Sequence, residues 1–177
     1  KPLTVYDGIK EYAKINPEDV KAVDLYLKEH GEKKKDYSKM KLGEKQIAVF
    51  EAAVEPQIWN PVFVMDHPVE ISPLTKIHRR DSRLVERFEP FLAGMELGNS
   101  YSELNDPEEQ RMRLKEQEAY RVVNDEAHPM DEDFLHAIET GMPPTGGVGI
   151  GIERLVMIIT DRPSIRDIIF FPTMKRS

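Results

Sequence analysis

The segment from Pro143 to Arg154 constrains the fold more than any other stretch of this chain. It reads PPTGGVGIGIER, and two prolines followed by glycines that alternate with β-branched residues are typical of a strand and incompatible with a helix interior. After Gly151 the apolar residues recur at the spacing of one helical face; they are Ile152, Leu155, Val156 and Ile159. The segment therefore predicts a short strand that leads directly into a helix.

Gly147, Gly149 and Gly151 would leave one face of this strand without side chains, so that a flat ligand could lie against the backbone. Arg154 falls in the first helical turn, where free N–H groups and the helix dipole favour an anion and a guanidinium suits phosphate oxygens. These residues indicate a phosphate-binding position. The alternative is a strand packed against a helix with Arg154 in a surface ion pair, and the glycines alone favour that alternative.

The chain has 177 residues, enough for one domain with a substantial core, which we place at residues 1–177. Its 25 Lys and Arg residues against 32 Asp and Glu residues give a formal net charge of −7. Proteins that mainly bind nucleic-acid backbones are usually basic. We therefore expect nucleic acid to touch only a small part of this segment.

The sequence contains no cysteine, which excludes disulfides, thiolate nucleophiles and cysteine-bound zinc, and which fits a cytoplasmic protein. No apolar run is long enough to span a membrane, and the N-terminal residues do not resemble a signal peptide, so we expect no membrane partner. The first residue is Lys1 and not methionine. We expect the chain to be cut from a longer protein.

Helix signals and strand signals alternate along the chain without regular βαβ units. Helices are predicted at 42–54, 107–123 and 131–140, and the second should face solvent because it is polar nearly all round. The apolar run Pro61–Met65 predicts a central strand covered on both faces, and the lone His67 after it is typical of a turn. The fold class that follows is α+β, an antiparallel sheet with flanking helices.

Two strands, Arg87–Phe91 and Met95–Leu104, are predicted around a tight turn at Ala93–Gly94. In this register Glu89 is the diagonal neighbour of Glu96 on one face of the hairpin. Two carboxylates on one face resemble a site for an oxygen-preferring divalent cation such as Mg²⁺ or Mn²⁺. The spacing alone favours the alternative, a solvated outer face.

Asn99, Tyr101 and Glu103 alternate along the second of these strands and therefore share one face, in the opposite phase to Glu96. All four can address one pocket only if an extra residue interrupts the strand. Gly98 is the natural place for such a bulge.

Several segments together resemble the class II lysyl-tRNA synthetases, over nearly the whole chain from about Leu3. They are Asp66–Lys76, Phe88–Glu89, Gly94–Asn105, Asp125–Phe134, Gly146–Arg154 and Ser164–Pro172. The glycine–arginine segment corresponds to the third class-defining motif of that family. The resemblance implies activation of an amino acid by ATP, with release of pyrophosphate, and transfer to tRNA. No protein nucleophile is needed, so positioning and charge neutralisation do most of the work.

The resemblance also implies roles at the nucleotide end of the site. Arg154 would clamp the ATP triphosphate and act as the catalytic residue. Glu89 and Glu96 would hold Mg²⁺ on the phosphate oxygens, and Gly149 would let ATP approach the strand.

At the amino-acid end, the resemblance implies that Glu103 binds the lysine ε-ammonium, with the Tyr101 ring beside the alkyl stem and Asn99 near the α-carboxylate. Gly151 would let lysine lie against the backbone. A buried carboxylate is what recognition of a long cation requires, because an uncharged analogue would leave that carboxylate unpaired.

The resemblance does not include the family's first and second motifs or its anticodon-binding domain. We therefore expect the chain to be the C-terminal portion of a catalytic domain, and to act on lysine, ATP and tRNA(Lys) only within a longer, homodimeric parent. As an isolated fragment it should be inactive.

Two other functions are compatible with the sequence. A synthetase paralogue that ligates lysine to a protein would keep the same ATP and metal residues, although Ser102–Pro107 and Ile165–Asp167 follow the tRNA-charging pattern. The non-enzymatic alternative is a folded but inactive module that binds ligand weakly. The absence of the second motif favours this alternative.

Overall fold

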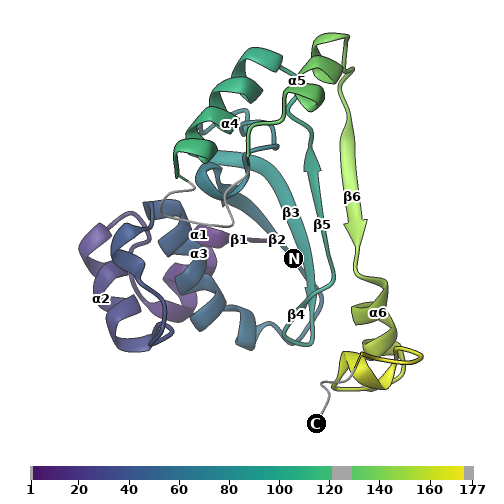
Figure 1. Ribbon diagram of the computed structural model, residues 1–177. Coiled ribbons are helices and arrows are strands. Elements are labelled where there is room, and N and C mark those ends of the chain that lie inside the picture. The colour runs from purple at the N-terminus through teal and green to yellow at the C-terminus, as the bar shows by residue number, and fades with distance from the viewer. Residues whose placement is uncertain (1, 121–128, 174–177) are drawn as a thin grey trace.

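The computed structural model describes residues 2–120 and 129–173, which form a six-stranded sheet with helices packed against it (Figure 1). The strands are β1 (Leu3–Thr4), β2 (Val62–Pro68), β3 (Leu84–Leu92), β4 (Met95–Glu96), β5 (Gly98–Ser102) and β6 (Gly146–Ile150). The helices are α1 (Val5–Gly8), α2 (Val20–His30), α3 (Leu42–Ala53), α4 (Pro107–Tyr120), α5 (Glu132–Glu139) and α6 (Ile152–Ile159). A π-helical turn, Ile9–Ala13, continues α1, and 3₁₀ turns lie at Tyr37–Lys39, Glu55–Gln57, Val69–Ile71 and Ile165–Asp167.

The sheet has the order β1-β2-β3-β5-β6, with β4 paired to β3. Among the described strands, β1 and β2 run parallel and every other pair is antiparallel. The predicted α+β class is confirmed. In Figure 1, β6 forms the outer edge of the sheet, and α1 to α3 lie together on the other side of the molecule.

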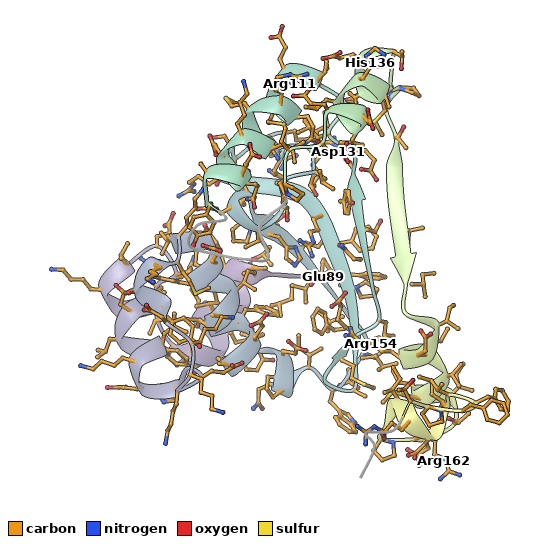
Figure 2. The ribbon with its side chains drawn as sticks, in the orientation of Figure 1. Glu89, Arg111, Asp131, His136, Arg154 and Arg162 are labelled. Atoms are coloured by element: carbon orange, nitrogen blue, oxygen red, sulfur yellow. The ribbon has the colours of Figure 1, made fainter. Side chains whose placement is uncertain are left out.

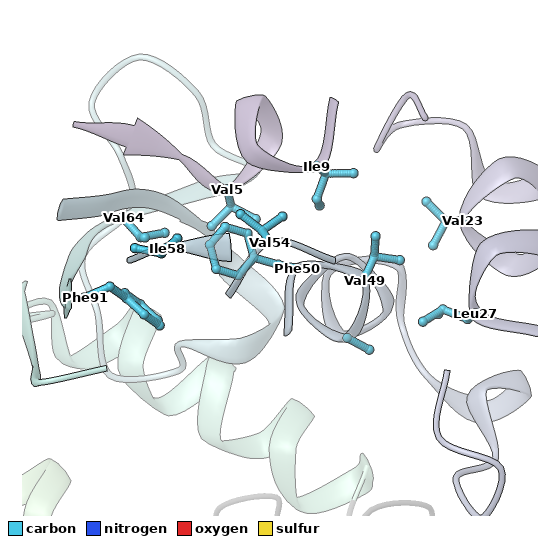
Figure 3. Close-up of a cluster of buried hydrophobic side chains, with 11 residues drawn as sticks. Val5, Ile9, Val23, Leu27, Val49, Phe50, Val54, Ile58, Val64 and Phe91 are labelled. Atoms are coloured by element: carbon cyan, nitrogen blue, oxygen red, sulfur yellow. The ribbon is translucent and has the colours of Figure 1, made fainter. Parts of the chain in front are cut away.

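The hydrophobic core lies between α1, α2, α3 and one face of the first strands of the sheet (Figure 3). Val64 of β2 and Phe91 of β3 contribute to it from the sheet, and the Phe91 ring meets Phe50 of α3 edge to face at 6.2 Å. On the opposite face of β2, Phe63 is 53% exposed and Met65 is 37% exposed. The prediction that this strand is covered on both faces is therefore wrong, because no described helix packs on its second face.

Helix α4 begins where the sequence predicts, with the Asp106 carboxylate accepting hydrogen bonds from the first-turn N–H groups. It does not simply face solvent. Gln110 and Arg113 are buried against the loop after β2, where they donate to the backbone oxygens of Pro73 at 3.0 Å and Thr75 at 2.6 Å. The predicted end of this helix near residue 123, and the start of the matching segment 125–134, lie outside the described residues.

The hairpin of β3 and β4 has the predicted turn. Ala93 and Gly94 both have positive φ, 53° and 70°, as a two-residue turn matched to the strand twist requires. Phe91 pairs with Glu96, as predicted. Within the described residues, no helix has the length and apolar character needed to cross a membrane.

Candidate functional site

The face of the sheet that packs on α3 continues past β3 onto β5 and β6, and the candidate residues lie on this continuation. The continuation depends on one irregularity. Phe91 pairs with Glu96, but Phe88 pairs with Ser100, so the second strand has one residue more than β3 over this interval. The extra residue is Leu97, between β4 and β5. The predicted bulge at or near Gly98 is confirmed.

The bulge brings both phases of the strand to one face. Arg87 pairs with Tyr101, and side chains alternate between the two faces of a strand. Glu89 therefore lies alongside Asn99, on the same face as Tyr101. Gly98 itself is needed because a Cβ atom there would lie 2.4 Å from the backbone oxygen of Gly149.

Glu89 and Glu96 both line a cavity of about 200 Å³ between β3 and α3. Figure 2 shows Glu89 in the interior, between the helices and the sheet. Its side chain is 13% exposed, and that of Glu96 is 35% exposed. Both residues therefore lie on one face of the sheet and line one cavity, which argues against a solvated outer face. That their carboxylates share a cation stays a prediction.

Glu89 is held by two basic side chains. His67 Nε2 lies 3.1 Å from Oε2, and Arg87 Nη2 donates to Oε1 at 2.6 Å. Burial disfavours the charged carboxylate, but the His67 ring and the Arg87 guanidinium outweigh it and keep the pKa of Glu89 below its usual value. His67 is a buried residue of β2 and not a turn residue, and its Nδ1 has no partner among the described residues.

The same cavity contains two further acids, Glu51 and Glu55, which come from the end of α3 and the turn after it. Burial raises the pKa of both carboxyl groups, and the neighbouring Glu89 raises both further. More acidic than basic side chains thus line the cavity, and a divalent cation would relieve the repulsion between the acids.

The two carboxylates fit part of a Mg²⁺ site. Mg²⁺ commonly takes one or two carboxylates and completes its shell with phosphates and water. Glu89 and Glu96 can supply the carboxylates, since each oxygen retains a free lone pair beside its present contact. In the described part of the chain, no three Asp, Glu or His side chains form a metal site on their own.

Arg154 lies in the first turn of α6, directly after the glycine strand, as predicted. Its Nη1 donates to the Glu96 backbone oxygen at 2.7 Å and lies 3.3 Å from Glu96 Oε2. The Arg154 side chain is 47% exposed. It contacts Glu96, which lines the cavity, but is not itself a lining residue. A half-exposed guanidinium at a helix N-terminus can bind an anion beside Glu96.

Gly147 and Gly149 of β6 pair with Tyr101 and Asn99, so the face that lacks side chains is the face of the candidate site. The Glu103 carboxylate lies over Gly147 on this face. Burial raises the pKa of Glu103, and its charge also raises the pKa of Tyr101, whose first cause is likewise burial. Gly151, the N-cap of α6, is close to Arg154.

Sequence reasoning assigned His67 to a turn, and it missed three further residues of the site: Arg87, Glu51 and Glu55. A signal was available for Arg87, which is two residues before Glu89 and so shares its face. Glu51 of α3 and Glu55 of the turn after it had no local signal, because only packing brings these segments against β3.

The chain resembles known proteins along nearly its whole length. Residues 3–175 match the family model described as tRNA synthetases class II (D, K and N). The lysine–tRNA ligase of Thermoanaerobacter pseudethanolicus is 49% identical over 180 residues, which covers 99% of this chain and 36% of that protein. The lysine–tRNA ligases of Moorella thermoacetica and Thermosynechococcus vestitus are 59% and 60% identical over 128 residues, 72% of this chain and 26% and 25% of those proteins. The chain thus spans about a third of the length of the relatives that match it throughout.

Proposed function

Because the chain belongs to the family of class II tRNA synthetases for aspartate, lysine and asparagine, we propose that it is the C-terminal portion of the catalytic domain of a lysine–tRNA ligase. Its activity within that enzyme would be ATP-dependent formation of lysyl-adenylate, followed by transfer of the lysyl group to tRNA(Lys). The relatives named above are lysine–tRNA ligases.

The observation that carries the lysine assignment is the position of Glu103. Its carboxylate lies over the bare backbone of Gly147, beside Tyr101 and on the face of the sheet that also carries Glu89. In the described part of the chain, no basic side chain forms an ion pair with it. The partly buried Glu103 carboxylate suits an ammonium group, and the Tyr101 ring next to it suits an apolar stem.

The two ends of the site would divide the work. Glu103 and Tyr101 would hold the lysine side chain, and Asn99 would orient the α-carboxylate. Arg154 would bind the triphosphate and stabilise the charge that develops on pyrophosphate. Held by Glu89 and Glu96, Mg²⁺ would supply further charge neutralisation at the phosphates. The chain's contribution is to fix these groups on one rigid sheet, so that both substrates meet in reactive geometry.

The remaining parts of the proposal concern the whole enzyme. It would act in the cytoplasm, in protein biosynthesis, as a homodimer with tRNA(Lys) as its second substrate. The 177-residue chain alone should not catalyse the reaction, because the arginine that the family uses to bind the amino-acid carboxylate and α-phosphate is not among its recognisable motifs.

The test is lysine-dependent exchange of pyrophosphate into ATP by the whole enzyme, followed by an assay of lysyl transfer. Lysine-dependent exchange with charging of tRNA(Lys) would support the proposal. Exchange with transfer to a protein and none to tRNA would identify a protein-modifying paralogue. Absence of lysine-dependent exchange would leave an inactive module. Exchange by the 177-residue chain alone would contradict the expectation that it is inactive.

A further inference from the structure

The Arg87 guanidinium donates hydrogen bonds to side chains from three different segments. Nη2 donates to Glu89 Oε1 at 2.6 Å, Nε donates to Asn99 Oδ1 at 3.0 Å, and Nη1 donates to Ser72 Oγ at 2.8 Å. The Arg87 side chain is only 18% exposed. An ion pair between Arg87 and Glu89 would not require the hydrogen bonds to Asn99 and Ser72. These two contacts therefore indicate a further role for Arg87.

We propose that Arg87 is a positioning residue that fixes the Glu89 carboxylate and the Asn99 amide in one geometry, and so links the metal end of the site to the amino-acid end. This inference rests on the function proposed above. The guanidinium is planar and rigid, and its donors have fixed directions. Rotation of either partner would therefore break a hydrogen bond in a poorly solvated place.

The contact with Arg87 also decides which way the Asn99 amide faces. A guanidinium has donors and no acceptor, so the amide atom that it contacts must be the oxygen. This leaves the Nδ2 donors for a ligand, and no group in the described part of the chain accepts from them. Asn99 would therefore meet the substrate as a donor, which suits the α-carboxylate and disfavours an ammonium group.

The third contact ties Arg87 to a part of the fold that does not depend on substrate. Ser72 is buried in the loop after β2. Arg113 of α4 holds this loop through the backbone oxygen of Thr75, and Gln110 holds it through that of Pro73. The guanidinium is thus oriented by packing before any ligand binds, which is the preorganisation that a binding site requires.

The test compares binding of lysine and of lysinamide, in which a neutral amide replaces the carboxylate, to the whole enzyme without metal or nucleotide. In Arg87→Lys the ammonium can still pair with Glu89 but cannot also reach Asn99 and Ser72. We expect calorimetry to show lysine binding weakened about tenfold or more, with a much smaller change for lysinamide. The matched control is Arg83→Lys, whose exposed guanidinium pairs with Asp81 and Glu18 outside the site.

A second variant separates orientation from contact. In Asn99→Asp both side-chain oxygens can still accept from Arg87, but no donor is left for the substrate. Lysine binding should again weaken about tenfold or more, because the new carboxylate repels that of lysine. Lysinamide binding should be retained. Equal weakening of both ligands in both variants, or lysine binding unchanged in Arg87→Lys, would overturn the positioning role.

A readout without ligand tests the contact itself. In enzyme labelled with nitrogen-15 at arginine, the Nε–H signal of Arg87 should be protected from solvent exchange, and protection should be lost in Asn99→Ala. An unprotected signal in the wild-type enzyme would overturn the inference. If the wild-type enzyme bound no lysine, the proposed function would fail, while this measurement would still decide whether Arg87 fixes Asn99.

Discussion

The Glu103 carboxylate occupies the space that a side chain at residue 147 would need: a Cβ atom on Gly147 would lie 2.4 Å from Glu103 Oε1. The Glu103 carboxylate can therefore take this position only because residue 147 is a glycine. Because Gly147 pairs with Tyr101, this feature also places the acid beside an aromatic ring.

Gly147→Ala should displace the Glu103 carboxylate without unfolding the protein, because the atom in the way is the end of a flexible side chain. We expect the KM for lysine in pyrophosphate exchange to rise about tenfold to a hundredfold, as misplacement of a binding group by about 1 Å commonly does. The matched control is Gly146→Ala, where the nearest atom to the new Cβ is 3.9 Å away. Equal KM values in the two variants would contradict the role of Glu103.

Lysine binding should depend on pH through Glu103. Burial raises the pKa of this carboxyl group, and only its charged form neutralises an ammonium. As the pH is lowered from neutral, the affinity for lysine should therefore begin to fall at a higher pH than it would if Glu103 had the pKa of an ordinary glutamate. Calorimetric titration of lysine from neutral to mildly acidic pH measures this. In Glu103→Gln the affinity should be low throughout and lack this pH dependence.

The Glu103 carboxylate should also lower the free energy of unfolding at neutral pH. A carboxyl whose pKa is raised in the folded state favours folding most below its unfolded pKa, and this contribution is lost as the pH rises through the folded pKa. Glu103→Gln should thus raise the free energy of unfolding at neutral pH, with the gain vanishing in acid. Urea unfolding at two pH values checks the sign. A variant less stable than the wild type at neutral pH would contradict it.

Arg154→Ala should impair pyrophosphate exchange by about a hundredfold or more, because it removes a contact to developing charge. Each tenfold loss corresponds to about 1.4 kcal/mol of transition-state stabilisation. The thermal midpoint should change little, since the ion pair with Glu96 is half exposed and such pairs contribute at most about 1 kcal/mol. Arg162→Ala, an exposed arginine beyond α6 (Figure 2), is the control. Exchange at the wild-type rate in Arg154→Ala would refute its role.

Glu89→Gln should raise the Mg²⁺ or Mn²⁺ concentration needed for half-maximal exchange by about tenfold or more, because an amide is a weaker ligand for a hard cation than a carboxylate. Binding of Mn²⁺ in the presence of ATP, followed by electron paramagnetic resonance, gives the affinity directly. Glu86→Gln is the control, since this neighbour on β3 points to the opposite face and binds Arg79 and Ser102. Identical metal requirements in both variants would argue against Glu89 as a ligand.

Much of the local structure was predictable because it depends on near neighbours. The turn at Ala93–Gly94, the cap at Asp106 and the passage from β6 into α6 follow from backbone geometry and side-chain period. The bulge at Leu97 was predictable as well, because Glu96 and Glu103 could not otherwise share a face.

The coverage of β2 was not predictable in this way. An apolar run indicates that a strand can be buried, but which of its faces is covered depends on helices elsewhere in the chain. The exposed Phe63 and Met65 show the outcome. For the same reason α4, although polar nearly all round, buries Gln110 and Arg113 against a loop that only the fold brings to it.

The sequence by itself determined the family, through the motifs that resemble it. It also determined the strands, turns and caps that carry the proposed site residues, because short-range patterns encode such elements. The tertiary structure alone decided how these residues are held. His67 contacts Glu89 from the neighbouring strand β2, and Ser72, in the loop that follows, accepts a hydrogen bond from Arg87. Glu51 reaches the cavity from helix α3. Such contacts join segments distant in sequence, and their geometry exists only once the core has brought helix and sheet together.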